Sequence, residues 1–97
     1  ISQAVLYPNV FDILKDGGIF ISLIKPQFEV GKSNVGKNGI VKDDSKRKEC
    51  IENLKIQAEK CGLVFEKITD SPIRGGDGNL EYLALFHKKI QSNGEKE

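Results

Sequence analysis

The sequence has few of the residues that build metal sites or disulfide frameworks. Its 97 residues include two cysteines and one histidine, and neither tryptophan nor methionine. With so few ligands, no zinc cluster is expected. Cys50 and Cys61 fall on one predicted helix, where a rise of ~1.5 Å per residue separates them by roughly 16 Å, whereas a disulfide spans at most about 7 Å. We therefore expect two reduced thiols.

Strong net charge and long hydrophobic runs are also absent. Fifteen Lys and Arg residues against 14 Asp and Glu residues give a net charge of +1, so the whole-chain field gives no reason to expect nucleic-acid binding. No apolar run approaches the ~20 residues of a membrane span, and no signal peptide is present. These features favour a cytoplasmic protein. The short length and the opening Ile1 indicate a fragment of a longer one.

The stretch that organises the rest of the chain runs from Gly17 to Glu29. Two glycines open it, residues 19–24 are apolar except for Ser22, and Lys25 and a proline end it. A continuous apolar run rich in β-branched and aromatic residues is typical of a strand buried on both faces. A lysine at the carboxyl end of such a strand lies where open α/β sheets place their chemistry.

The other segments predict an α/β fold in the order helix, strand, helix, strand, strand. The first helix covers residues 2–15, with Pro8 either kinking it or marking a later start. The second helix begins near residues 43–45 and ends near residue 60, and strands follow at 63–69 and 80–86. The first two strands should be parallel and the third antiparallel. If the third inserts between them, the order is first, third, second.

The long connection at 28–44 contains a near match to a phosphate-binding P-loop, from Gly31 to Asn38. We reject a P-loop because Asn38 lacks the hydroxyl that would bind Mg²⁺ and because a glycine follows where a helix should begin. The simplest alternative is a mobile basic loop. A weaker functional reading is that Lys32, Lys37 and Lys42 contact phosphates non-specifically.

Lys25 and Glu81 form the sharpest candidate site. Lys25 follows an apolar run, and Glu81 stands inside another, where a carboxylate is costly unless it is paired. The antiparallel arrangement would bring the two residues close together. They could form a catalytic pair, in which the lysine takes or holds a proton. The structural alternatives are a simple ion pair and a lysine that extends from a strand end to solvent.

Three separated motifs carry a resemblance to a known family. In chain order they are Lys25-Pro-Gln-Phe-Glu29, Val35-Gly-Lys-Asn-Gly-Ile-Val-Lys-Asp43 and Ser71-Pro-Ile-Arg-Gly-Gly-Asp-Gly-Asn-Leu-Glu-Tyr-Leu83. Together they resemble the carboxyl-terminal half of the TlyA family of FtsJ-like RNA methyltransferases, often named hemolysin A. The resemblance implies a doubly wound, Rossmann-like fold, of which residues 1–90 would be the carboxyl-terminal part and 91–97 a polar tail. It also implies transfer of a methyl group from S-adenosylmethionine to a ribose 2′-hydroxyl of ribosomal RNA.

The resemblance further implies roles for single residues. Lys25 matches the second lysine of the family's Lys-Asp-Lys-Glu tetrad, and Glu81 matches its glutamate. The other two tetrad members, the glycine-rich cofactor loop and an S4-like RNA-binding domain would lie upstream of residue 1. We therefore expect the chain alone to be inactive and to self-associate through the open strand edge at 18–25. The alternative is a non-enzymatic module that binds RNA or a membrane surface.

Overall fold

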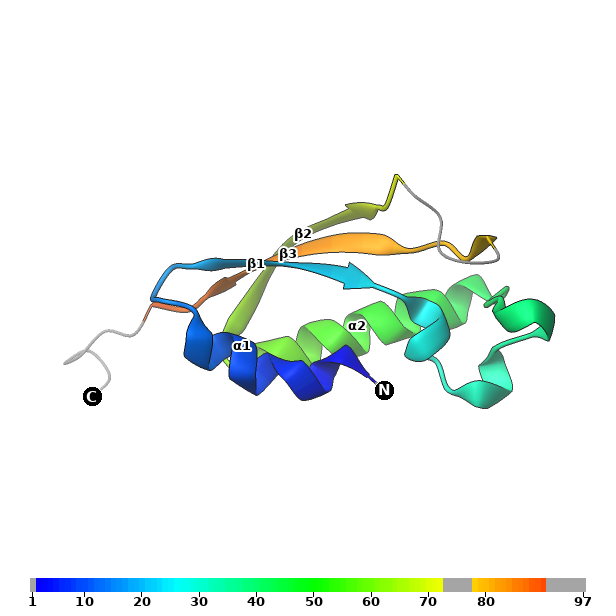
Figure 1. The fold of residues 1–97 in the computed structure, drawn as a ribbon, viewed down its shortest axis with the longest axis horizontal. Coiled ribbons are helices and arrows are strands. Elements are labelled where there is room, and N and C mark those ends of the chain that lie inside the picture. The colour runs from blue at the N-terminus through cyan, green and yellow to red at the C-terminus, as the bar shows by residue number, and fades with distance from the viewer. Residues whose placement is uncertain (1, 73–77, 91–97) are drawn as a thin grey trace.

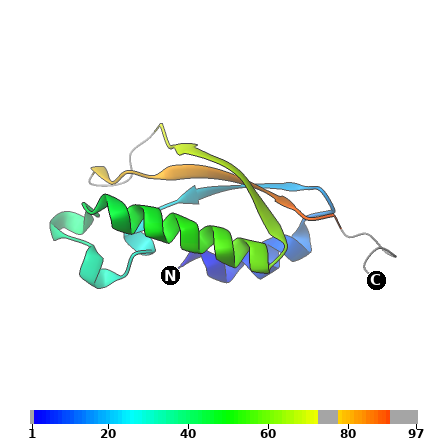
Figure 2. The same cartoon turned by 180° about the vertical axis from the view of Figure 1, so that it is seen from behind.

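The computed structural model describes residues 2–72 and 78–90 and has a sheet on one side and helices on the other (Figures 1 and 2). The main helices and strands are α1 (Tyr7–Ile13), β1 (Ile19–Ile24), α2 (Asp44–Lys60), β2 (Leu63–Asp70) and β3 (Tyr82–Lys88). Short 3₁₀ turns complete it: η1 (Gln3–Leu6), η2 (Pro26–Phe28), η3 (Lys32–Asn34) and η4 (Lys37–Gly39).

The sheet has the predicted topology. The strand order is β1-β3-β2, and β3 pairs antiparallel with both neighbours. The central strand is also the one without an exposed residue, and Ala84 and Phe86 on it are almost fully buried. β3 begins two residues later than expected, at Tyr82, and Asn79 before it makes side-chain hydrogen bonds to a loop.

The starts of both helices and the buried face of α2 have local causes in the sequence. The side chain of Asp43 caps α2 by accepting a hydrogen bond from the Ser45 amide at 2.9 Å. On α2, Cys50, Leu54 and Ala58 are buried at helical spacing. Pro8 lies in the first turn of α1, which follows the 3₁₀ turn η1, so the helix starts late and is not kinked.

An aromatic cluster joins α1 to the three strands of the sheet. The rings of Tyr7, Phe20, Phe65 and Phe86 pack with centroids 5.9–6.3 Å apart. Burial, followed by the charge of Glu29, raises the pKa of Tyr7 far above its ordinary value, so its hydroxyl stays protonated. This cluster fixes α1 against β1 and so sets the position of the strand's carboxyl end.

The prediction that β1 is buried on both faces is wrong for this chain. Ser22 and Ile24 face the helices and are buried, whereas Ile19 and Ile21 on the other face are 60% and 62% exposed. The reason is that α1 and α2 both lie on one face of the sheet, and no described element covers the other (Figures 1 and 2). The predicted tail at 91–97, and residues 73–77 of the 70–79 loop, lie outside the described residues. Among the described helices, none combines the length and the hydrophobicity that crossing a membrane requires.

Candidate functional site

The carboxyl end of β1 and the amino end of β3 meet at one rim of the sheet. Ile24 and Tyr82 form the last ladder pair, so the next residue on each strand, Lys25 and Glu81, leaves the sheet at the same place. The 28–43 connection lies beyond this same end (Figure 1). The structure thus brings Lys25 and Glu81 to one rim, although 56 positions separate them in the sequence. Their catalytic role stays a prediction.

Glu81 is buried and hydrogen-bonded. Only 4% of the residue is exposed, and its carboxylate Oε2 accepts a hydrogen bond from the Gln27 side-chain Nε2 at 2.8 Å. Its main-chain oxygen accepts from the Ser71 amide at 2.8 Å, which holds the strand entry in place. A buried carboxylate requires donors of this kind. The donor to the side chain is neutral.

Lys25 is half-buried and does not pair with Glu81. Its Nζ lies 5.7 Å from the centroid of the Phe28 ring. Among the ion pairs of residues 2–72 and 78–90, none joins Lys25 to Glu81. The structural ion pair between Lys25 and Glu81 is therefore not formed, and the Lys25 ammonium lies near the Phe28 ring.

Gln27 is the residue of this rim that sequence reasoning missed. It stands two positions after Lys25, and its Nε2 supplies the side-chain hydrogen bond to Glu81. Its Oε1 is buried and has no hydrogen-bond partner within the described part of the chain. The signal that could have found it is its place in the Lys-Pro-Gln-Phe-Glu motif, between a lysine and a carboxylate.

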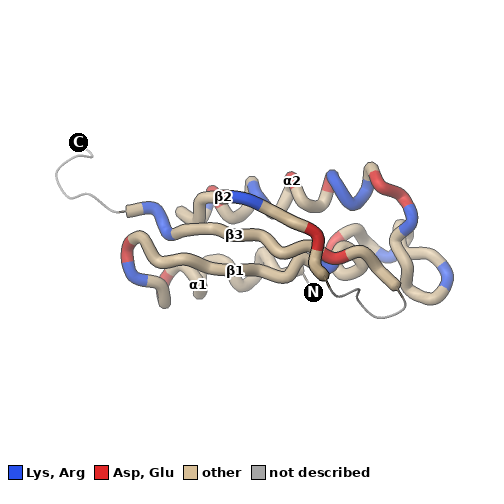
Figure 3. The backbone as a smooth tube through the Cα atoms, turned by 90° about the horizontal axis from the view of Figure 1, so that it is seen from above, with Lys and Arg blue, Asp and Glu red and all other residues tan. Residues whose placement is uncertain are grey.

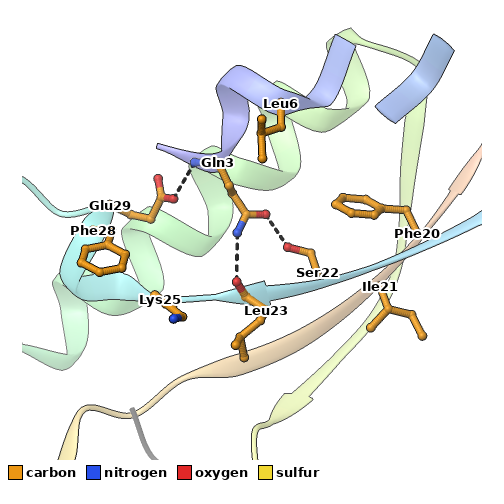
Figure 4. A pocket seen from close by; sticks show the side chains of 9 residues that line it. All are labelled: Gln3, Leu6, Phe20, Ile21, Ser22, Leu23, Lys25, Phe28 and Glu29. Carbon is orange, nitrogen blue, oxygen red and sulfur yellow. Dashed lines mark hydrogen bonds between the residues drawn. The ribbon is translucent and has the colours of Figure 1, made fainter. Parts of the chain in front are cut away.

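A hollow of about 320 Å³ opens beside the outer edge of β1 (Figure 4). Its wall is mostly apolar, with Lys25 and Glu29 at the polar end. The lining residues are Gln3, Leu6, Phe20, Ile21, Ser22, Leu23, Lys25, Phe28 and Glu29.

Hydrogen bonds of two polar side chains connect the segments that line this hollow. The carboxylate of Glu29 accepts from the Ser2 hydroxyl at 2.7 Å and from the Gln3 amide at 3.0 Å, so it caps the start of the first helical segment. Gln3 in turn donates from Nε2 to the Leu23 carbonyl at 3.1 Å and accepts from the Ser22 hydroxyl (Figure 4). The motif that follows Lys25 is thereby fixed to the amino-terminal turn.

The basic loop carries its three lysines on the surface. Lys32, Lys37 and Lys42 are all exposed, and the loop lies past the rim end of β1 and β3, which are uncharged over most of their length (Figure 3). The segment from Gly31 to Gly39 forms two 3₁₀ turns, and the helix begins only at Asp44. No helix amides face the glycines, so the segment is not a P-loop. Asn79 ties this loop to β3, donating from Nδ2 to the Gly39 carbonyl at 2.6 Å and accepting from the Val41 amide at 3.0 Å.

The chemistry available at the rim is proton transfer. It combines an amine that has no ion-pair partner among the described residues with a buried, hydrogen-bonded carboxylate. In the described ranges 2–72 and 78–90, no group of three or more His, Cys, Asp or Glu side chains could hold a metal ion. Both cysteines are free thiols.

Comparisons with known proteins agree with the motif resemblance. A family model described as FtsJ-like methyltransferase matches residues 2–88. Hemolysin A of Brachyspira hyodysenteriae is 40% identical over 86 residues, which are 89% of this chain and 36% of that protein. The 16S/23S rRNA (cytidine-2′-O)-methyltransferase TlyA of Mycobacterium tuberculosis is 34% identical over 82 residues, covering 84% of this chain and 31% of the relative.

A solved structure shows the same fold. A hemolysin-like protein from Lactococcus lactis superposes with a TM-score of 0.87 at 39% identity, over 92% of this chain and 42% of that one. The chain therefore spans about a third of the curated relatives it matches. The family resemblance and the fold expected from it are confirmed.

Proposed function

Because the chain belongs to the FtsJ-like methyltransferase family, we propose that it forms the carboxyl-terminal part of an S-adenosylmethionine-dependent methyltransferase that modifies ribose 2′-hydroxyls of ribosomal RNA in the cytoplasm. The observation that carries the proposal is the arrival of Lys25 and Glu81 at one rim of the sheet. The name of the M. tuberculosis relative, which specifies 2′-O-methylation of cytidine in rRNA, supports the choice of substrate.

In this proposal the chain supplies proton handling. Once unprotonated, the amine of Lys25 accepts the proton of the ribose 2′-hydroxyl, and the oxygen keeps the electron pair and becomes the nucleophile. Glu81, held by Gln27, orients the groups around that amine. Lys25 is suited to the task because it is half-buried and is not consumed by an ion pair with Glu81.

The chain's own residues do not fit a site for S-adenosylmethionine. A glycine-rich turn that passes directly from a strand into a helix is the usual cradle for such a cofactor. The connection that follows β1 in this structure is instead a series of 3₁₀ turns, and Lys25-Pro26 comes directly after the strand. We therefore assign cofactor binding to residues outside this chain, and expect the isolated 97 residues to give no turnover with S-adenosylmethionine and rRNA.

The decisive experiment is a chimaera in which this chain replaces the matching 82 residues of the M. tuberculosis relative. We expect the chimaera to methylate rRNA, with the product detected as 2′-O-methylcytidine by mass spectrometry. Lys25→Ala and Glu81→Ala should each abolish most of that activity. A folded chimaera without activity, or unchanged rates in both variants, contradicts the proposal.

The exposed lysines of the 28–43 connection are proposed to contact the RNA backbone. Each phosphate contact contributes about 0.7–0.9 to the slope of log affinity against log salt. Replacing Lys32, Lys37 and Lys42 with Gln in the chimaera should therefore lower the slope by about 2–3. If the 97-residue chain binds RNA in a salt-dependent way while the folded chimaera does not methylate rRNA, a purely RNA-binding module is favoured instead.

We also propose that the 18–25 edge of β1 supports self-association. β1 is an edge strand on one side, and Ile19, Ile21 and Leu23 on its open face are 41–62% exposed. Sedimentation of the 97-residue chain should reveal a dimer that Ile21→Lys disrupts. A species that stays monomeric at high concentration counts against this part of the proposal.

A further inference from the structure

Gln27 is placed between the two residues assigned to catalysis. It lies on the η2 turn, two positions after Lys25, and reaches across the sheet rim to Glu81 on the entry to β3. The contact joins segments 54 positions apart. Within residues 2–72 and 78–90 it is the only side-chain hydrogen bond to the Glu81 carboxylate, and the distance of 2.8 Å is that of a good hydrogen bond.

The orientation of the Gln27 amide is determined by the charge of Glu81. An ionised carboxylate only accepts hydrogen bonds, so the amide must turn its NH₂ group toward it. The reverse orientation would set two acceptors against each other. Because Oε1 has no hydrogen-bond partner among the described residues, no second contact favours the reverse orientation of the amide. The amide is therefore held by Glu81 alone.

Gln27 also occupies a place that a cation could take. A buried carboxylate attracts the nearest ammonium, and Lys25 leaves the sheet at the same rim. In the structure the carboxylate is served by the neutral amide, while the Lys25 ammonium lies near Phe28. The other charged residue of this short motif, Glu29, is engaged with Ser2 and Gln3.

We propose that Gln27 is a positioning residue of the methyltransferase site: its amide holds the Glu81 carboxylate in place with a neutral donor and so keeps the Lys25 amine out of an ion pair. The inference rests on the proposed function, because it assigns Gln27 a task only if Lys25 and Glu81 are catalytic. It adds a third residue to the rim, one whose side chain touches Glu81 rather than the reacting atoms.

Two substitutions separate this role from simple packing. Gln27→Leu keeps the size of the side chain but removes the donor, so Glu81 turns to the Lys25 ammonium, which then holds its proton more firmly. Gln27→Glu is isosteric but places a second carboxylate against the first, unless one of them is protonated. A protonated Glu at position 27 can again donate to Glu81.

The test uses the chimaera with the M. tuberculosis relative. We expect Gln27→Leu to lower kcat roughly 10- to 100-fold with little change in KM for RNA, and to shift the pH–activity profile to higher pH. Gln27→Glu should recover activity relative to the unsubstituted chimaera as the pH falls. The matched control is Gln57→Leu on α2, which should leave kcat, KM and the pH profile unchanged.

The outcomes distinguish the inference from the function on which it rests. If Glu81→Ala loses activity but both Gln27 variants match the unsubstituted chimaera, the positioning role is wrong and the proposed function stands. If Glu81→Ala is fully active, the proposed function itself fails. An NMR measurement on the 97-residue chain checks the contact directly: the Gln27 side-chain NH₂ resonances should shift in Glu81→Gln. Unshifted resonances overturn the inference, even if the Gln27 variants of the chimaera do not fold.

Discussion

The two ends of the sheet each place a lysine beside an aromatic ring, yet they use it differently. At the end where β1 begins, the Lys88 Nζ donates to the carbonyls of Phe11 and Leu14 at 2.9 and 2.8 Å and lies 4.1 Å from the Phe11 ring centroid. These carbonyls close the carboxyl end of α1, where a cation is favourable. Lys88 is therefore a structural cap.

At the rim end, Lys25 has no such hydrogen bonds to residues that the structure describes. The Phe28 ring is 5.7 Å away, the nearby carboxylate is served by Gln27, and Phe28 itself is 59% exposed. Lys88 holds the junction of helix and sheet, whereas Lys25 makes no side-chain hydrogen bond or ion pair within the described residues. We therefore expect Lys25 to matter less for the fold than Lys88.

The largest effect should come from Lys25 in catalysis. In the chimaera, Lys25→Met should lower kcat/KM by about 10²–10⁴, the usual contribution of a general acid or base. Lys88→Met should lower activity only as far as it lowers the folded fraction. Both are measured by rRNA methylation at a temperature at which circular dichroism shows folded protein. Equal losses in the two folded variants would break the comparison.

Stability should show the opposite ranking. In the 97-residue chain, Lys88→Met should reduce the free energy of unfolding by about 1.5–3 kcal/mol, because two carbonyls lose a charged donor. Lys25→Met should change it by less than about 0.5 kcal/mol. Urea unfolding followed by circular dichroism measures both. A larger loss for Lys25→Met than for Lys88→Met would show that the rim lysine is the structural one.

The loop at the rim is fixed by hydrogen bonds of Asn79, not by Lys25. Asn79 is 3% exposed and bonds both the Gly39 carbonyl and the Val41 amide. Asn79→Ala should cost about 1–3 kcal/mol of stability by leaving those groups unpaired. The Val41 amide should also exchange its hydrogen faster. Asn53→Ala, at an exposed position of α2, is the control and should be near neutral. Unchanged exchange at Val41 would show that the loop does not depend on Asn79.

Most of the fold could be predicted because it depends on local patterns and loop lengths. The Asp43 cap, the α2 spacing and the apolar run of β3 are read from neighbouring residues, and the ten-residue connection favours an antiparallel return. The exposure of Ile19 and Ile21 was not predictable in this way. An apolar run indicates a strand, but what covers each face depends on elements elsewhere.

The site was predictable only in part for a similar reason. Lys25 and Glu81 stood out as polar residues in apolar runs, and the strand register brought them together. Gln27 did not stand out, because a glutamine after a proline is unremarkable until the register shows which carboxylate it reaches. A contact between residues 54 positions apart depends on the exact strand register and on the side-chain rotamer of Gln27. Neither can be read from a single sequence.

The smallest expected effect on stability concerns the two thiols, which lie toward opposite ends of α2. Cys50 is buried in the half of α2 nearer the rim, whereas Cys61 follows the helix at the other end and is half-buried. Burial, then the charges of Glu29 and Glu49, raises the pKa of Cys50 from 9.0 to about 11.

Because the folded state holds this proton more tightly, stability should be level below pH 9 and fall as the pH rises toward 11. In Cys50→Ala this decline should be shallower, as measured by urea unfolding at pH 8, 9, 10 and 10.5, and Cys61→Ala should retain the full decline. Equal slopes in Cys50→Ala and the unsubstituted chain would show that the Cys50 thiol does not contribute.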